Sequence, residues 1–129
     1  MLFRDFGLCE SVLRAVTDEG YETPTPVQAE AIPHILAGRD VLASAQTGTG
    51  KTAAFAIPIL QNLDLAQTKR PQALILAPTR ELAVQVAGEF ERIAAGTPIV
   101  VLSLYGGKPM KPQISRLQRG TSVIVGTPG

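Results

Sequence analysis

The sequence predicts an α/β domain built around a parallel β-sheet, and three observations support this. Apolar runs of high β-propensity recur along the 129 residues with little polar alternation, at 40–45, 72–77, 98–104 and 122–127. Such runs are typical of parallel strands that are buried on both faces. Helical patterns separate them, which predicts right-handed crossovers with helices on both faces of the sheet. A glycine-rich string, SAQTGTGKT at 44–52, lies between the first run and a helix.

The helices are predicted from apolar residues that recur at a spacing of three or four. Pro58 is expected to kink the helix after the glycine-rich string, because proline removes a backbone hydrogen bond. Gly20, Gly96 and Gly120 are the expected helix stops. The side chains expected to face the core are Val12, Leu13, Val16, Leu82, Val86, Phe90, Ile93, Ile114 and Leu117.

The composition allows one domain with a full core and excludes several classes of function. Hydrophobic residues make up 45% of the chain, and no apolar run approaches the roughly 18 residues that span a bilayer. The first ten residues do not have the pattern of a secretion signal. Cys9 and His34 are each the only residue of their type. We therefore expect no disulfide, a structural role for His34, no membrane partner and a cytoplasmic location.

Charge is unevenly distributed along the chain. The net charge is +1, but the residues up to Glu91 carry 11 acidic and 7 basic side chains, whereas those from Arg92 onward carry five basic and none acidic. A basic segment can meet phosphates. A solvated helix face explains the same pattern, so charge alone does not decide between these interpretations.

The string at 44–52 fits the phosphate-binding P-loop pattern except that Ala45 replaces its first glycine. The backbone N–H groups of such a loop surround phosphates, and the following helix N-terminus adds a partial positive charge. Lys51 is expected to contact the β- and γ-phosphates, and the Thr52 hydroxyl to ligate Mg²⁺. A glycine-rich turn without a ligand is the alternative.

With three further strings, this loop resembles that of the DEAD-box RNA helicases. GYETPTPVQ at 20–28 resembles their Q motif, and Phe3 stands 17 residues before it, where the family places an isolated aromatic. PTREL at 78–82 is similar to motif Ia. GG at 106–107 and TPG at 127–129 are similar to the two later RNA-contacting motifs. The match runs from Phe3 to the last residue, and the bacterial cold-shock-associated branch is the most similar.

The resemblance implies a RecA-like P-loop NTPase domain that binds ATP and Mg²⁺. Residues 1–129 would form the N-terminal part of RecA-like domain 1, with the Q motif at 20–28 and the P-loop at 45–52. The Gln28 amide can accept from the N6 amino group of adenine and donate to N7. Guanine has the acceptor O6 in place of this amino group, so it would face the glutamine oxygen with another acceptor, which favours ATP over GTP. Tyr21 is the candidate for stacking on the base, near Phe3. Alternatively, Gln28 and Tyr21 only begin and pack a helix.

The candidate site residues fall into four groups. Lys51 and Thr52 are the catalytic candidates, and Thr52 is also the metal ligand. The cofactor-binding candidates are Phe3, Tyr21, Gln28, Ala45, Gln46, Thr47, Gly48, Thr49, Gly50, Lys51 and Thr52. The RNA-binding candidates are Pro78, Thr79, Arg80, Gly106, Gly107, Thr127, Pro128 and Gly129. The resemblance implies that these last residues contact the RNA backbone, with little sequence preference; for Arg80 the alternative is a charge on the first turn of a helix.

None of the eleven acidic residues follows an apolar strand, where a P-loop ATPase needs a carboxylate. The resemblance therefore implies a fragment of truncated fold, without the later strands, the D-E-A-D motif and the second RecA-like domain. We expect the fragment to be inactive alone and to self-associate through exposed sheet edges. The parent would be an ATP-dependent RNA helicase that couples ATP hydrolysis to local duplex unwinding. The alternatives are a non-catalytic nucleotide- or RNA-binding module, and a different P-loop enzyme, which predicts neither the Gln28 clamp nor PTREL.

Overall fold

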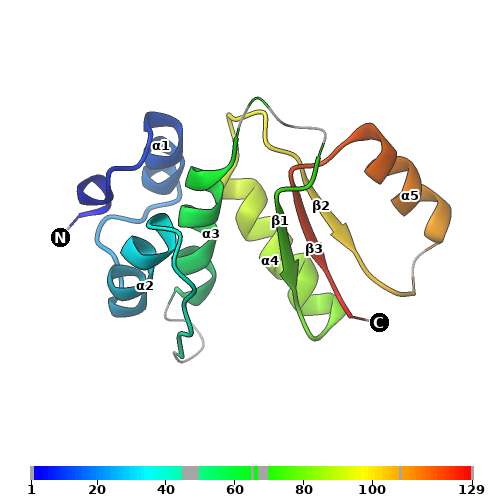
Figure 1. The fold of residues 1–129 in the computed structure, drawn as a ribbon, viewed down its shortest axis with the longest axis horizontal. Helices are drawn as coiled ribbons and strands as arrows, with labels where there is room; N and C mark the ends of the chain where they lie inside the picture. Colours follow the sequence, from blue (N-terminus) through cyan, green and yellow to red (C-terminus); the bar gives the residue numbers. More distant parts are fainter. Residues whose placement is uncertain (1, 45–49, 65, 67–69, 108, 129) are drawn as a thin grey trace. The chain divides into compact units, whose positions relative to one another are not determined.

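The structure, a computed structural model, describes residues 2–44, 50–64, 66, 70–107 and 109–128. The chain divides into two compact units, Met1–Asn62 and Leu63–Gly129 (Figure 1). In the described part of the first unit lie η1 (Phe3–Phe6), α1 (Glu10–Asp18), α2 (Pro26–Leu36) and α3 (Lys51–Asn62). The second unit holds β1 (Ala73–Leu76), α4 (Arg80–Ile93), β2 (Val101–Leu104), α5 (Met110–Arg119) and β3 (Val123–Gly126). No helix in these described ranges is long and apolar enough to cross a membrane.

The first unit is built on the packing of α2 against α3, with α1 contacting α3 and η1. Val16, Ile32 and Ile57 are fully buried in its core. α2 starts with Pro26. Proline suits this position because the first N–H groups of a helix make no hydrogen bond within the helix. α3 continues through Pro58, whose side chain is buried. The helix predicted after the glycine-rich string therefore forms.

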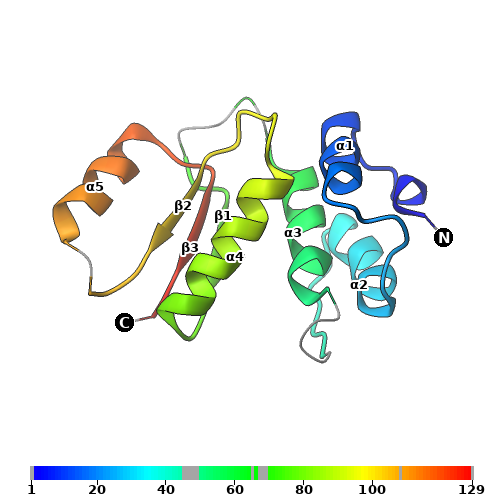
Figure 2. The same cartoon turned by 180° about the vertical axis from the view of Figure 1, so that it is seen from behind.

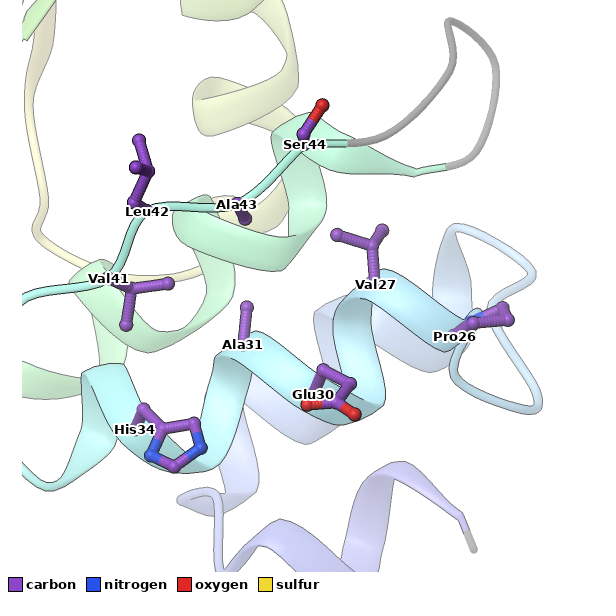
Figure 3. A pocket seen from close by; sticks show the side chains of 9 residues that line it. All are labelled: Pro26, Val27, Glu30, Ala31, His34, Val41, Leu42, Ala43 and Ser44. Atoms are coloured by element: carbon purple, nitrogen blue, oxygen red, sulfur yellow. The ribbon is translucent and has the colours of Figure 1, made fainter.

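The strand predicted at 40–45 does not form over the part that the structure describes, 40–44. A strand exists through hydrogen bonds to a neighbouring strand, and none of the described strands pairs with this segment. Its side chains nevertheless alternate as in an extended chain: Val41 and Ala43 point toward α2, and Leu42 and Ser44 point away (Figure 3). Leu42 is consequently fully exposed.

The second unit contains a parallel three-stranded sheet in the order β1-β3-β2. Its register places the last residues of the strands, Leu76, Gly126 and Leu104, next to one another. The strands predicted within 72–77, 98–104 and 122–127 are thus confirmed. α4 lies across one face of the sheet, behind it in Figure 1 and in front of it in Figure 2, and contacts β2 and β3.

The two helices of this unit bury their apolar residues to different extents. α4 buries Val86, Phe90 and Ile93 as predicted, but Leu82 is 38% exposed, and the buried position in the first turn belongs to Ala83. α5 contains no buried residue, and Ile114, predicted to face inward, is 45% exposed. Among the strands, α5 packs mainly against β2, which is an edge strand, so few side chains surround it.

Candidate functional site

Gln28 connects the starts of α2 and α3. Its side-chain oxygen accepts from the Thr25 N–H at 3.0 Å, and its side-chain nitrogen donates to the Gly50 carbonyl at 3.2 Å. The same carbonyl accepts the first helical bond of α3 from the Ala54 N–H at 3.1 Å. Gln28 is only 1% exposed. The alternative role foreseen for Gln28, beginning and packing a helix, is therefore present in the structure.

Gly50 lies where no other residue fits without strain. Its φ is +81°, a left-handed conformation that favours glycine. A Cβ at this position would overlap the Gln28 side-chain nitrogen and lie 3.3 Å from the Thr25 Oγ1. That hydroxyl oxygen is itself buried without a hydrogen-bond partner among the described residues. The last loop residue before Lys51 is thus held tightly by the Q-motif segment.

Lys51 and Thr52 are the first two residues of α3. Lys51 is exposed and Thr52 is half-buried. The backbone N–H groups of a first helical turn have no intrahelical acceptor, which makes this end of α3 suitable for an anion. Ala45, Gln46, Thr47, Gly48 and Thr49, the other loop candidates, lie outside the described residues.

The two aromatic candidates lie together in the first unit. Phe3 is buried, and its ring centroid lies 6.1 Å from that of Tyr21 at a tilt of 40°. Phe6 packs edge-on against Phe3 at 5.9 Å. Phe3 thus supports Tyr21, as expected, from the start of the chain.

A pocket of about 470 Å³ lies between α2 and the extended segment 41–44 (Figure 3). Val27, Ala31 and Val41 point into it, and Glu30 and His34 of α2 are also among the residues that line it. None of the predicted site residues that the structure describes is part of its lining. His34 pairs with Arg39 at 3.4 Å through its Nδ1 atom, which agrees with a structural role.

The RNA-binding candidates that the structure describes all follow strand ends in the second unit. Residues 78–80 follow β1, residues 106–107 follow β2, and residues 127–128 follow β3. Because the strands are parallel and in register, these three loops share the carboxyl edge of the sheet. Ligands of open α/β sheets bind at this edge. Gly129 lies outside the described residues.

Arg80 and Gly107 are in direct contact at this edge. Gly107 has a φ of +84°, and a Cβ on it would lie 2.6 Å from the Arg80 Nη1. Arg80, Glu81, Val84 and Tyr105 line one shallow pocket of about 550 Å³. A second pocket of about 290 Å³ shares Tyr105 and contains three more candidates, Gly106, Gly107 and Thr127. The structure therefore brings residues from the three separate motifs together.

The remaining candidates hold the ends of the loops. Thr79 is the N-cap of α4, and its hydroxyl oxygen accepts from the Leu82 N–H at 3.2 Å. The Thr127 N–H donates to the Leu104 carbonyl at 3.2 Å, which extends the pairing of β3 with β2. Pro78 and Pro128 are exposed. Within the described ranges, no three His, Cys, Asp or Glu side chains gather in a way that holds a metal ion.

Sequence reasoning missed two residues that shape these sites. Thr25 precedes Gln28 in the T-x-x-Q pattern of a capping box, so this signal was available. Gln113 bonds to the backbone of Tyr105, at the start of the loop after β2. Gln113 and Tyr105 are eight positions apart in the sequence, and no local sequence pattern predicts a contact between them.

Comparison with known proteins shows that this fold is that of a helicase domain. Residues 25–129 match the family described as DEAD/DEAH box helicase, and the chain belongs to this family. It is 55% identical over 130 residues to the ATP-dependent RNA helicase DeaD of Escherichia coli K12, covering 98% of this chain and 20% of that protein. It is 46% identical over 127 residues to the DEAD-box ATP-dependent RNA helicase CshA of Bacillus cereus, covering 98% of this chain and 24% of that one.

A solved structure matches the chain over its whole length. The crystal structure of a DEAD box protein from the hyperthermophile Methanococcus jannaschii has a TM-score of 0.91 and 39% identity, covering 100% of this chain and 35% of that one. The predicted RecA-like parallel α/β fold is confirmed. The chain thus spans between a fifth and a quarter of the length of these two curated relatives.

Proposed function

We propose that this chain carries the adenine and phosphate site, and part of the RNA surface, of an ATP-dependent RNA helicase. The observation that carries the proposal is the pairing of motif residues that are distant in sequence. Gln28 contacts Gly50 directly before Lys51, and Arg80 contacts Gly107 at the carboxyl edge of the sheet. The names of the relatives from Escherichia coli and Bacillus cereus support the same function.

The nucleotide would be held at the start of α3. The Lys51 ammonium would act as a point charge on the β- and γ-phosphates, and the helix N-terminus would add its partial positive charge. The Thr52 hydroxyl suits Mg²⁺, which prefers oxygen ligands and keeps most of its coordination for water and phosphate. A single protein ligand at the second position of the helix therefore fits this ion.

Adenine recognition would use the bonding capacity that Gln28 has left. Its amide nitrogen has two hydrogens and its oxygen has two lone pairs, and the contacts to Gly50 and Thr25 use one of each. One donor and one acceptor remain for N7 and N6 of adenine. Because Gln28 is buried, the base would bind only with a local opening, with Tyr21 and Phe3 as its aromatic neighbours.

RNA would bind at the carboxyl edge of the sheet. The Arg80 guanidinium and the hydroxyls of Thr79 and Thr127 would donate to phosphate oxygens, and Gly106 and Gly107 would let the strand approach the backbone. Contacts to phosphate and sugar carry little sequence information. Pro78, Pro128 and Gly129 would complete this surface.

The whole protein would act in the cytoplasm, coupling ATP binding and hydrolysis to local unwinding of RNA duplexes. The 129-residue chain would form the N-terminal part of the first RecA-like domain, with the Q motif at 20–28 and the P-loop at 45–52. By itself it would be inactive. Both edge strands of its described sheet, β1 and β2, would offer sites for self-association.

The nucleotide site is tested by calorimetric titration of the chain with Mg-ADP and Mg-GDP. We expect ADP to bind more tightly than GDP, and Gln28→Glu to remove most of this preference. The glutamate keeps an acceptor for the Thr25 N–H but has no donor for adenine N7 or for Gly50. Gln85→Glu on α4 is the matched control. Equal affinity for both nucleotides in the unmodified chain would refute the Q-motif assignment.

A non-catalytic binding module is the second candidate. It predicts the same nucleotide and RNA binding but no turnover in the whole protein, whereas the helicase predicts RNA-stimulated ATP hydrolysis that Lys51→Ala abolishes. We expect no turnover by the 129-residue chain, with or without RNA. Measurable RNA-stimulated hydrolysis by this chain would contradict that expectation.

A further inference from the structure

The loop between β2 and α5 is held by one side chain of the helix that follows it. The Gln113 side-chain oxygen accepts from the Tyr105 N–H at 3.1 Å. Its side-chain nitrogen donates to the Tyr105 carbonyl at 3.4 Å and to the Pro109 carbonyl at 3.3 Å. The amide of one side chain therefore bonds to the backbone before Gly106 and after Gly107, and so links the two ends of the loop.

Helix capping alone does not explain this arrangement. A bond to Pro109, four residues earlier, is the local contact expected in a first helical turn. The two bonds to Tyr105 span eight residues and fix the residue at which the chain leaves β2. α5 buries none of its own side chains. Because α5 is only partly covered, the three hydrogen bonds of Gln113 are a direct polar link between the helix and the loop.

The loop after β2 also contacts Arg80, the first residue of α4. The guanidinium lies over the Cα of Gly107, on the side where any other residue would place its side chain. Arg80 is exposed, and the described residues provide no carboxylate within salt-bridge distance of it. The close contact that the structure gives for the guanidinium is the one with Gly107. A shift of this loop would therefore change the direction of the Arg80 guanidinium even if α4 itself stayed in place.

We propose that Gln113 is a positioning residue for RNA binding, which holds the loop of residues 105–107 so that Gly107 directs Arg80 toward the RNA backbone. The role in RNA binding rests on the proposed function of this edge, whereas the positioning of Arg80 stands on geometry alone. Gln113 itself does not need to contact RNA. Its effect is transmitted through the loop backbone to one cation.

The positioning is tested without RNA by nuclear magnetic resonance on the 129-residue chain. Gln113→Leu is similar in size, suits a helix and removes all three bonds. We expect faster exchange of the Tyr105 amide, together with shifts of the Gly107 amide and Arg80 Nε–H signals. Gln118→Leu, on the same helix, should leave these signals unchanged. Unchanged Gly107 and Arg80 signals in Gln113→Leu would overturn the proposal. If that variant does not fold, Gln113→Glu keeps the bond from the Tyr105 N–H but loses both donated bonds, and it should still shift the Gly107 and Arg80 signals.

The consequence for RNA is tested by fluorescence anisotropy with a labelled single-stranded oligouridine. We expect Gln113→Leu to weaken binding about tenfold, as for one charge-assisted hydrogen bond, and to lower the salt slope by about 0.7, the value for one phosphate contact. Arg80→Gln should add little to Gln113→Leu, because both remove the same contact. Additive losses would refute the coupling. If Arg80→Gln alone has no effect, the proposed RNA function of this edge fails, and the resonance experiment still decides the positioning.

Discussion

Replacing Gly50 by alanine tests whether the Q-motif segment and the phosphate loop are mechanically linked. The new methyl group meets two obstacles. The backbone φ of +81° is strained for any residue with a Cβ, and the Cβ would overlap the side-chain nitrogen of Gln28. Gln28 is 1% exposed and bonded at both ends of its amide, so it cannot move aside freely. We expect the clash to break the Gln28–Gly50 hydrogen bond.

The magnitude follows from the two obstacles taken separately. A left-handed backbone costs an L-residue about 1–2 kcal/mol. A buried donor that loses its acceptor costs about 1–3 kcal/mol in addition. Gly38 separates these contributions, because its φ is also +81° but a Cβ there meets nothing within 4 Å. We therefore expect Gly50→Ala to lower the free energy of unfolding by about 2 kcal/mol more than Gly38→Ala does.

The assay is urea denaturation followed by far-ultraviolet circular dichroism, with amide hydrogen exchange in α3 as the local measurement. Gln28→Ala provides the cross-check, since it removes the side chain that the methyl group would hit. In that background Gly50→Ala should cost no more than Gly38→Ala. Equal losses for Gly50→Ala and Gly38→Ala in the unmodified chain would show that the link to Gln28 contributes nothing.

Three further predictions concern single residues. Gly107→Ala should cost only about 1–2 kcal/mol of backbone strain, because the overlapping Arg80 is exposed and can move away, but it should weaken RNA binding in an anisotropy titration; full RNA affinity would refute the contact. Thr79→Ala should lower the free energy of unfolding by about 1 kcal/mol in urea, because it removes the N-cap of α4, and no loss would contradict this role. Partial burial raises the pKa of the Cys9 thiol, but hydrogen bonds from Ser11 and nearby backbone groups outweigh this and hold the pKa below its ordinary value of 9.0. The thiolate is therefore favoured in the folded state, so the midpoint of the alkylation rate against pH should rise when urea unfolds the chain, and an unchanged midpoint would contradict it.

The sequence alone predicted much of the candidate sites because their residues are contiguous motifs. Lys51 and Thr52 follow a glycine-rich string, and the pattern requires them to begin a helix, as they do. Local pattern also located α4 and the three strands of the described sheet. It did not show that Gln28 is buried, because burial depends on α3, which lies more than twenty residues later.

The tertiary structure decided what depends on neighbours that are distant in the chain. The apolar run at 40–45 has the composition of a strand, yet 41–44 pairs with none of the described strands, because a strand needs a partner as well as a pattern. Leu82 and Ile114 have helical spacing but few neighbours, so they remain exposed. The strand order β1-β3-β2 and the Gln113–Tyr105 bonds likewise became visible only in three dimensions. The sequence by itself determined which residues are the candidates for the chemistry, because backbone periodicity and loop motifs are local. The tertiary structure decided which of the described candidates touch, because contact is set by packing between segments far apart in the chain.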